Sequence, residues 1–406
     1  MVNTNLEKFT QVHEAVGTDS LMDTKYIFKN ARPKSDCPPY LHSIKNHSMQ
    51  VVQFLNDGHT LDELEGTYHT YIASKNVYIV NYDQIRSNKN DLLTRQCRSL
   101  ILRKNTQWEL IANSFVRFFN YGENADETKR IQENIQQCTI LEKKDGSLIT
   151  VTHFDNEWHV FTRGSDADNN PFRGMVPHDS KETFGQKVRQ FLSLDRLHTQ
   201  RTYVFELCVP GSHITQYFQE HISLLTVLEN GTELSPDVVT AMAMEHKWDR
   251  PKSYHFESVD DMFATLAQTP HDFEGFVIQF QNIRVKLKKD TYKMYHLMAG
   301  TSVTTQSLMR VCLLNEIDEF LTIQCLQKFK SNLQPIQEFV TSKLLDIQAV
   351  YNEHKSKPAK EYASIVTKHP FKSILFQLYR GHVTFDVPQH VDKWVKAMAD
   401  VYDKQG

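Results

Sequence analysis

The chain has 406 residues, of which 40% are hydrophobic and 23% charged, as in an ordinary folded protein. Its formal net charge of −3 excludes general electrostatic attraction to an anionic partner, so such a partner would need a local basic surface. The six cysteines show no pair at metal-ligand spacing, which argues against a zinc site or a disulfide framework. No apolar run is long enough to span a membrane, and the first residues do not resemble a signal peptide. We therefore expect an intracellular protein, cytoplasmic or, in a eukaryote, nuclear.

Residues 1–75 are polar and mixed in character, and the stretch 31–40 contains three prolines, which is typical of a loop. The pattern indicates no function for this segment. We expect it to be an extension that packs on the following domain or forms part of it.

Residues 76–300 contain most of the predicted strands. Hydrophobic and β-branched runs predict strands at 77–82, 148–154, 158–162, 202–209, 222–228 and 276–280. Residues 155–157 have the composition of a hairpin turn, and residues 180–194 show apolar side chains at helical spacing. The fold class predicted for this segment is α+β, built on antiparallel sheets.

Residues 301–406 have a different character. They contain two glycines, and apolar side chains such as Leu308, Val311 and Cys312 recur at helical spacing. We expect a separate, all-helical C-terminal domain.

A candidate nucleophile lies at residues 143–147, which read Lys-Lys-Asp-Gly-Ser at the end of an apolar strand. A lysine amine is a good nucleophile only where burial or nearby cations lower its pKa. The strand at 283–288 supplies three cations, because its basic residues alternate with apolar ones and therefore share one face. The pattern predicts that these cations keep Lys143 deprotonated.

Further candidate parts of a phosphate-handling site follow one another along the chain. Arg98 begins a strand, aromatic residues occur at 118–121, and Arg163 ends the hairpin. Glu206 lies among apolar strand neighbours and therefore needs a cation or a metal as partner. Each part alone has an ordinary explanation, such as a surface turn, a packed phenylalanine or a solvent-facing strand. Their joint occurrence favours a site.

The order of these motifs resembles the covalent nucleotidyltransferase superfamily of ATP-dependent ligases and mRNA capping enzymes. The closest likeness is to the phage-type RNA ligase 1 family, which repairs broken tRNA. It rests on stretches within about residues 76–320, at 97–98, 117–120, 143–147, 163–165, 205–207, 274–277 and 286–288. The chain departs from the family in having Arg117 and Arg163 where relatives often have lysine, and Ser99 where they have glycine.

The resemblance implies that Lys143 becomes covalently bound to AMP. It also implies that Arg98 holds a phosphate or ribose, that Phe119 stacks on adenine and that Glu274 anchors the ribose or a metal-bound water. Magnesium, or manganese in its place, would be held by Glu206 and Asp318. The implied nucleotide-binding residues are Tyr82, Arg98, Arg117, Phe119, Lys143, Gly146, Arg163, Glu206, Glu274, Lys286, Lys288 and Tyr292.

The implied activity is ATP-dependent sealing of RNA ends that carry a 5′-phosphate and a 3′-hydroxyl, through lysyl-AMP and an adenylylated RNA 5′ end. The expected substrate is RNA under repair, above all a tRNA broken in its anticodon loop. A separate kinase and phosphatase are expected to prepare the ends, because the chain has no Gly-rich phosphate loop followed by Lys-Ser or Lys-Thr.

Three alternatives stay open. DNA ligases and capping enzymes of the superfamily carry an OB-fold after the last motif, and the glycine-poor segment from residue 301 does not fit one. A GTP-dependent, capping-type guanylyltransferase is nevertheless an alternative, as is a catalytically silent RNA-binding module of the same fold. The fungal tRNA ligase domain is a closer rival, but its first motif usually has asparagine where Asp145 stands.

Overall fold

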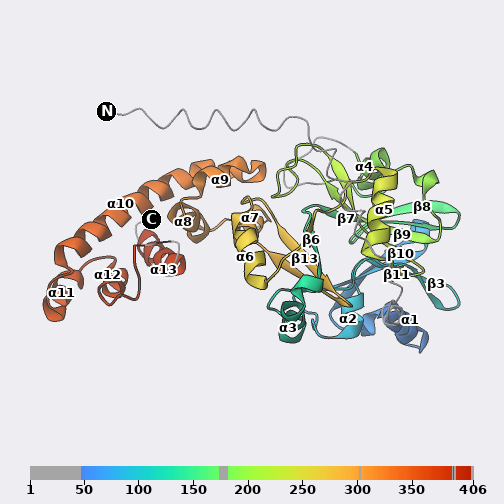
Figure 1. The fold of residues 1–406 in the computed structure, drawn as a ribbon, viewed down its shortest axis with the longest axis horizontal. Helices are drawn as coiled ribbons and strands as arrows, with labels where there is room; N and C mark the ends of the chain where they lie inside the picture. The colour runs from blue at the N-terminus through green and yellow to red at the C-terminus, as the bar shows by residue number, and fades with distance from the viewer. Residues whose placement is uncertain (1–46, 173–181, 301–302, 386, 388–389, 404–406) are drawn as a thin grey trace. The chain divides into compact units, whose positions relative to one another are not determined.

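The computed structural model describes residues 47–172, 182–300, 303–385, 387 and 390–403 (Figure 1). In these residues three sheets, antiparallel except for one strand pair, are followed by a series of helices. This is the predicted α+β class with a helical C-terminal region. No helix in the described ranges combines the length and apolar character needed to cross a membrane.

The first sheet is antiparallel and has the strand order β1-β2-β3-β4. Its strands are β1 (Thr67–Ile72), β2 (Val77–Tyr82), β3 (Leu100–Lys104) and β4 (Trp108–Ala112). Helices α1 (His47–Asn56) and α2 (Leu92–Gln96) pack on it through a shared apolar cluster. Because β1 pairs with β2 along its whole length, residues before the predicted boundary at 76 form part of this sheet.

The second sheet has the order β11-β10-β9-β7-β8. Its strands are β7 (Ser147–Phe154), β8 (Glu157–Thr162), β9 (Arg201–Cys208), β10 (His221–Glu229) and β11 (Thr232–Glu233). The predicted hairpin turn joins β7 to β8, with Asp155 and Asn156 both at positive φ, which suits the tight turns of hairpins. Helices α4 (Phe184–Phe191) and α5 (Pro236–His246) pack on this sheet. Helix α4 falls within the predicted helix, of which residues 180 and 181 lie outside the described ranges.

The third sheet has the order β12-β6-β13-β14-β5, and its one parallel pair is β14 with β5. Its strands are β5 (Phe119–Asn120), β6 (Thr139–Glu142), β12 (Ser253–Tyr254), β13 (Gly275–Phe280) and β14 (Ile283–Lys288). Helices α3 (Ala125–Glu133) and α6 (Val259–Gln268) bury the apolar side chains of β13 and β14. The basic side chains of β14 lie on the opposite face, because the residues of a strand alternate.

The remaining helices share one large apolar core, which includes the fully buried Trp394. They are α7 (Asp290–Gly300), α8 (Thr305–Leu313), α9 (Ile317–Thr322), α10 (Lys330–His354), α11 (Ala359–Val366), α12 (Lys372–Tyr379) and α13 (Val391–Tyr402). Helix α10 is the long orange helix in Figure 1. Helix α7 precedes the predicted boundary at 301, yet Tyr292, Tyr295 and Met298 belong to this core.

Candidate active site

Lys143 lies in the short link between β6 of the third sheet and β7 of the second. Its backbone N–H donates to the carbonyl of Gly275 at 2.8 Å, which fixes it to β13. Gly146 lies against β9, and a Cβ there would come within 2.5 Å of the Leu207 carbonyl oxygen. Only glycine allows this approach. The turn is thus held by both sheets, and the position of Lys143 follows from it.

Three cavities meet at Lys143, and Glu206 also lines all of them. The main cavity has a volume of about 250 Å³, and its lining includes Tyr82, Phe115, Phe118, Arg284, Lys286 and Lys288. The polar cavity has a volume of about 440 Å³ and is lined by Asp145, Ser212, His213, Glu274, Tyr292 and His296, among others. The third cavity, of about 360 Å³, includes Arg98, Arg163 and Asn170. The Lys143 amine is therefore accessible from the main cavity, which is lined by aromatic and basic side chains, and from the polar cavity.

The ionisation of Lys143 differs from the prediction. Its Nζ donates to Glu274 Oε2 at 2.9 Å. Burial disfavours the charged amine, but the carboxylates of Glu274 and Glu206 outweigh burial and raise the pKa of Lys143. The prediction that the basic strand keeps this lysine deprotonated is wrong for the ligand-free protein, because the direct partner of the amine is a buried carboxylate.

Glu274 joins two lysines. It is 3% exposed, and its Oε1 lies 2.7 Å from Lys288 Nζ while Oε2 accepts from Lys143. The next residue, Gly275, has a φ of +141°, and a Cβ there would meet the Leu287 carbonyl oxygen at 1.9 Å. Glycine therefore allows β13 to start directly against β14. Glu274 is held between the two amines and sets their separation.

Glu206 projects from β9 and is the carboxyl group shared by the three cavities. Burial, helped by the neighbouring Glu274 and Asp145, raises its pKa to about 7 in spite of the lowering effect of Lys143 and Arg98. A carboxyl group with a pKa of about 7 is partly protonated at pH 7, and it loses its proton readily when a cation binds beside it. This is the environment expected for a ligand of a divalent metal.

The described residues hold no cluster of three or more His, Cys, Asp or Glu side chains arranged to bind a metal. Glu206, Glu274 and Asp145 nevertheless line the same polar cavity, and carboxylate oxygens are ligands that magnesium takes together with water and phosphate oxygens. Asp318 is exposed on α9 and lines none of the three cavities. The structure does not bring it together with Glu206, because α9 packs into the helical core through Phe320.

Strand β14 places its three basic side chains in the main cavity, as the alternation predicts. Lys286 has its pKa lowered to about 8 by burial and by the neighbouring cations Arg98, Lys143 and Lys288. Arg284 is committed to Glu233 through two hydrogen bonds of 2.9 and 2.8 Å. Lys288 is likewise paired with Glu274, so Lys286 is the basic side chain of this strand for which the described residues provide no ion pair.

Arg98 and Arg163 line both the main and the third cavity. Each has a buried guanidinium nitrogen, Arg98 Nη1 and Arg163 Nε, for which the described part of the chain provides no hydrogen-bond partner. Buried donors without partners are costly and are usually satisfied by a ligand or water. The two unpartnered donors of Arg98 and Arg163 therefore indicate a position for an anionic group.

Tyr82 lies between two guanidinium groups. Its ring centroid is 4.1 Å from Arg117 Cζ and 4.8 Å from Arg163 Cζ. Arg117 also hydrogen-bonds to Ser87 and is not among the residues that line the three cavities. Tyr82 thus reaches the main cavity, while Arg117 supports its ring.

Asn81 was not selected by sequence reasoning, yet it joins the two arginine segments. It is 1% exposed, its Nδ2 donates to the Arg163 carbonyl at 2.9 Å, and its Oδ1 accepts from the Ser99 N–H at 2.9 Å. Ser99 directly follows Arg98 and has a positive φ of 51°. The signal in the sequence is a single polar residue inside the apolar run of β2.

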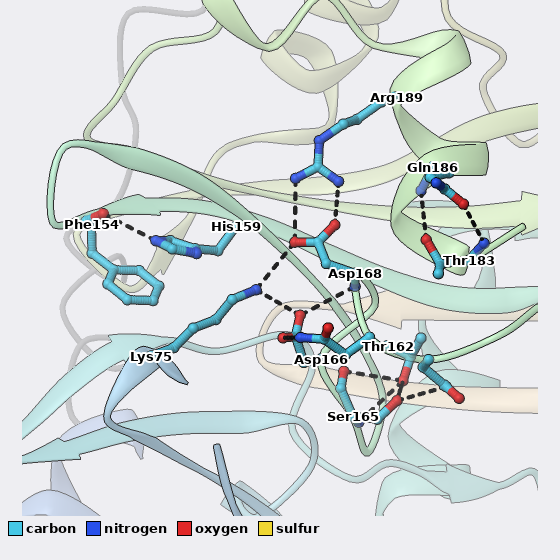
Figure 2. A network of polar contacts seen from close by, with 12 residues as sticks. Lys75, Phe154, His159, Thr162, Ser165, Asp166, Asp168, Thr183, Gln186 and Arg189 are labelled. Atoms are coloured by element: carbon cyan, nitrogen blue, oxygen red, sulfur yellow. Dashed lines mark hydrogen bonds and ion pairs between the residues drawn. The ribbon is translucent and has the colours of Figure 1, made fainter. Parts of the chain in front are cut away.

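A polar network fastens the loop that follows Arg163, as Figure 2 shows. Lys75 Nζ lies 2.6 Å from Asp166 and 3.2 Å from Asp168, and Arg189 of α4 also pairs with Asp168. The hydroxyls of Thr162 and Ser165 hydrogen-bond at 2.7 Å. The first sheet and α4 together hold this loop, so the position of Arg163 depends on residues far from it in sequence.

The structure does not place Phe119, the residue predicted to stack on adenine, in any of the three cavities. It is buried, and its ring packs under the Arg95 guanidinium at 4.8 Å. Phe118 lines the main cavity instead, with Arg98 and Lys286 each 5.3 Å from its ring centroid. Adjacent residues of an extended chain point to opposite sides, and the prediction chose the buried one of the two.

Tyr292 is buried on α7 and lines the polar cavity. Burial raises the pKa of its hydroxyl, and so do Glu274 and Asp145. Two residues of this cavity, His213 and His296, were missed. His296 lies four residues after Tyr292 on the same helix, a spacing that could have indicated it, whereas His213 lies in a loop without a pattern.

Comparisons with known proteins show what the chain is similar to. Residues 96–292 match a family model described as RNA ligase. The chain is also 28% identical over 265 residues to a candidate bifunctional polynucleotide kinase/RNA ligase of Autographa californica nuclear polyhedrosis virus. That match covers 60% of this chain and 37% of the viral protein, so the chain spans little more than a third of its relative.

Solved structures with a weaker likeness include an archaeal ATP-dependent RNA ligase, with a TM-score of 0.41 and 10% identity over 71% of this chain and 77% of that one. Another is an RNA ligase variant of Naegleria gruberi solved with ATP and Mn, with a TM-score of 0.34 and 14% identity over 44% of this chain and 57% of that one. The family match covers Lys143, Glu206, Glu274 and the basic strand. Residues 96–292 are therefore similar to the RNA ligase family of the phage RNA ligase 1 type.

Proposed function

We propose that this chain is an ATP-dependent RNA ligase that joins RNA ends carrying a 5′-phosphate and a 3′-hydroxyl. The observation that carries the proposal is the position of the Lys143 amine, which is bound to Glu274 at the meeting point of three cavities. Four basic side chains that could bind phosphate line the main cavity with it, namely Arg98, Arg163, Lys286 and Lys288.

In the first step Lys143 Nζ attacks the α-phosphorus of ATP. A P–N bond forms, the bond between that phosphorus and the bridging oxygen breaks, and pyrophosphate leaves. The AMP group then passes to the 5′-phosphate of the RNA, which frees the lysine. Finally the RNA 3′-hydroxyl displaces AMP and closes the phosphodiester bond.

The attacking amine must first lose a proton. Glu274 is hydrogen-bonded to Nζ and is therefore the group placed to accept it. Lys286 and Lys288 stabilise the negative charge that develops on the α-phosphate, together with the unpartnered donors of Arg98 and Arg163. A magnesium or manganese ion held by Glu206, with Glu274 and Asp145 through water, would supply further positive charge to the phosphates.

The base and ribose of ATP would lie in the main cavity, whose lining includes Phe118 and Tyr82. We propose RNA repair as the role and a tRNA broken in its anticodon loop as the substrate, recognised by the helical region. The viral relative carries both a kinase and a ligase in its name, which supports a reaction in which ends are phosphorylated before they are sealed. We propose that a kinase and a phosphatase prepare the ends.

The test is adduct formation with labelled ATP and magnesium on a denaturing gel. We expect one AMP per chain, bound through an acid-labile and alkali-stable phosphoramidate at Lys143. Lys143→Ala and Lys143→Arg should abolish the adduct, whereas Lys129→Ala, on the exposed surface of α3, should label like the wild type.

Labelling with GTP in parallel, followed by sealing of a nicked tRNA anticodon stem-loop, completes the design. An adduct with GTP but not ATP would identify a guanylyltransferase instead. Absence of an adduct with either nucleotide, in a protein that still binds RNA, would overturn the enzyme proposal.

A further inference from the structure

A loop beside Lys143 displays an aromatic ring to solvent. Residues 209–220 connect β9 to β10, and within them Phe218 has a relative exposure of 106%. The adjacent Tyr217 is largely covered, and its ring contacts His221 with centroids 4.9 Å apart. Such a ring offers both of its faces to a ligand that can stack on it.

The loop is bonded to the turn that carries Lys143. Asp145, two residues after that lysine, accepts hydrogen bonds from the backbone N–H groups of Ile214 and Thr215, both at 3.0 Å. In return, the backbone N–H of Asp145 donates to the Tyr217 hydroxyl at 3.0 Å. The loop and the reactive turn therefore form one hydrogen-bonded unit.

Two further contacts hold the loop on either side of the exposed ring. Asp272 accepts from the backbone N–H of Gln216 at 2.8 Å, and its carbonyl accepts from the Thr215 hydroxyl at 2.7 Å. After the ring, Glu220 pairs with the buried Lys187 of α4 at 2.9 and 3.0 Å. The backbone is thus fastened before and after Phe218, and the ring is presented at low entropic cost to a partner.

The same loop leads into the site. Ser212 and His213, a few residues before Phe218, line the polar cavity together with Lys143. The main cavity already contains the rings of Phe115, Phe118 and Tyr82, whereas Phe218 is not in its lining. The exposed ring is therefore available to the second substrate. Proteins hold single-stranded nucleic acid by stacking bases on such aromatic rings, which is tolerant of sequence.

We propose that Phe218 is a stacking platform for the terminal nucleobase of the 5′-phosphorylated RNA end, holding that end at the polar cavity. The inference rests on the proposed ligase function, because it assigns the ring to the RNA substrate of that reaction. The ring does not take part in the bond changes at Lys143. It positions the RNA for the steps that follow formation of the AMP adduct.

The experiment uses the full chain and a 5′-phosphorylated RNA with 2-aminopurine as its first base. The wild type should quench the fluorescence of this probe, and a probe six nucleotides inside the strand should respond much less. Phe218→Ala and Phe218→Leu should weaken RNA binding and raise KM for RNA about 5- to 100-fold, while Phe218→Trp should restore both. AMP labelling from ATP should stay at the wild-type level in every variant.

The matched control is Met244→Ala, which removes another exposed apolar side chain, on α5. It should bind and seal as the wild type does. Wild-type binding and sealing by Phe218→Ala, or by Phe218→Leu, would overturn the stacking role. Failure of the wild type to form an AMP adduct would instead contradict the proposed function, while the fluorescence measurement would still report on the ring.

Discussion

The sheet-rich part of the chain and its helical part bury different kinds of side chain. In the described residues, every buried side chain classed as polar or charged lies at or before Glu274, and several of them touch the site. From α8 onward the buried side chains are apolar or aromatic and form one continuous core. Burial stabilises the helical part directly, whereas in the sheet-rich part it also sets hydrogen bonds and ionisation states.

This difference indicates whether a substitution should change the stability of the protein or the properties of the site. Removing a side chain from the helical core costs transfer and packing free energy and should lower stability. Removing one from the cavity lining should change nucleotide binding or reactivity with a smaller change in stability. The following predictions run from the largest expected effect to the smallest.

Trp394→Ala should destabilise the protein by about 3–5 kcal/mol, because this side chain is fully buried in the helical core and its ring lies 5.7 Å from that of Phe385. Urea unfolding would measure the loss. Lys396→Ala, on the exposed side of the same helix, should stay within about 0.5 kcal/mol of the wild type. AMP labelling per folded molecule should not change in either variant. A loss below about 1 kcal/mol for Trp394→Ala would contradict the contrast between the two parts.

The adjacent phenylalanines 118 and 119, at the start of β5, give a comparison between neighbouring residues. Phe118→Ala should raise KM for ATP about 5- to 100-fold with little loss of stability, because Phe118 lines the main cavity. Phe119→Ala should lower the free energy of unfolding by about 3–5 kcal/mol and leave KM nearly unchanged, because its ring is buried under Arg95. Steady-state labelling and urea unfolding of both variants would check this. The reverse pattern would restore the sequence-based assignment of Phe119.

Lys286 should give ATP binding a pH dependence. Its pKa in the ligand-free protein is lowered to about 8, so the side chain is charged below that pH and neutral above it. The affinity for metal-free ATP should therefore fall about tenfold between pH 7 and 9. Lys286→Arg should flatten this profile, because arginine stays charged. Equilibrium binding across pH measures it, and an equal fall in the arginine variant would assign the titration to another group.

Local patterns were sufficient for much of the fold. The alternation in β14 gave the shared face of its basic residues, and the two residues at positive φ between β7 and β8 occur where the turn composition indicated. Helical spacing indicated the C-terminal helices. These features depend on neighbours within a few residues, which sequence reasoning can use.

The errors and omissions in the site come from long-range contacts. The choice between Phe118 and Phe119 depends on how β5 pairs with β14, across more than 160 residues. The charge of Lys143 depends on Glu274, which is 131 residues away and hydrogen-bonded to it. Asn81 acts on Arg163 across 82 residues. A local sequence pattern does not indicate any of these long-range contacts.

The bridge from Lys143 through Glu274 to Lys288 also has a chemical consequence for the resting protein. An amine held as an ammonium ion reacts slowly with acetyl donors, cyanate and other electrophiles of the cell. Glu274, which must take a proton from Lys143 during turnover, therefore also protects this lysine from irreversible acylation in the nucleotide-free protein.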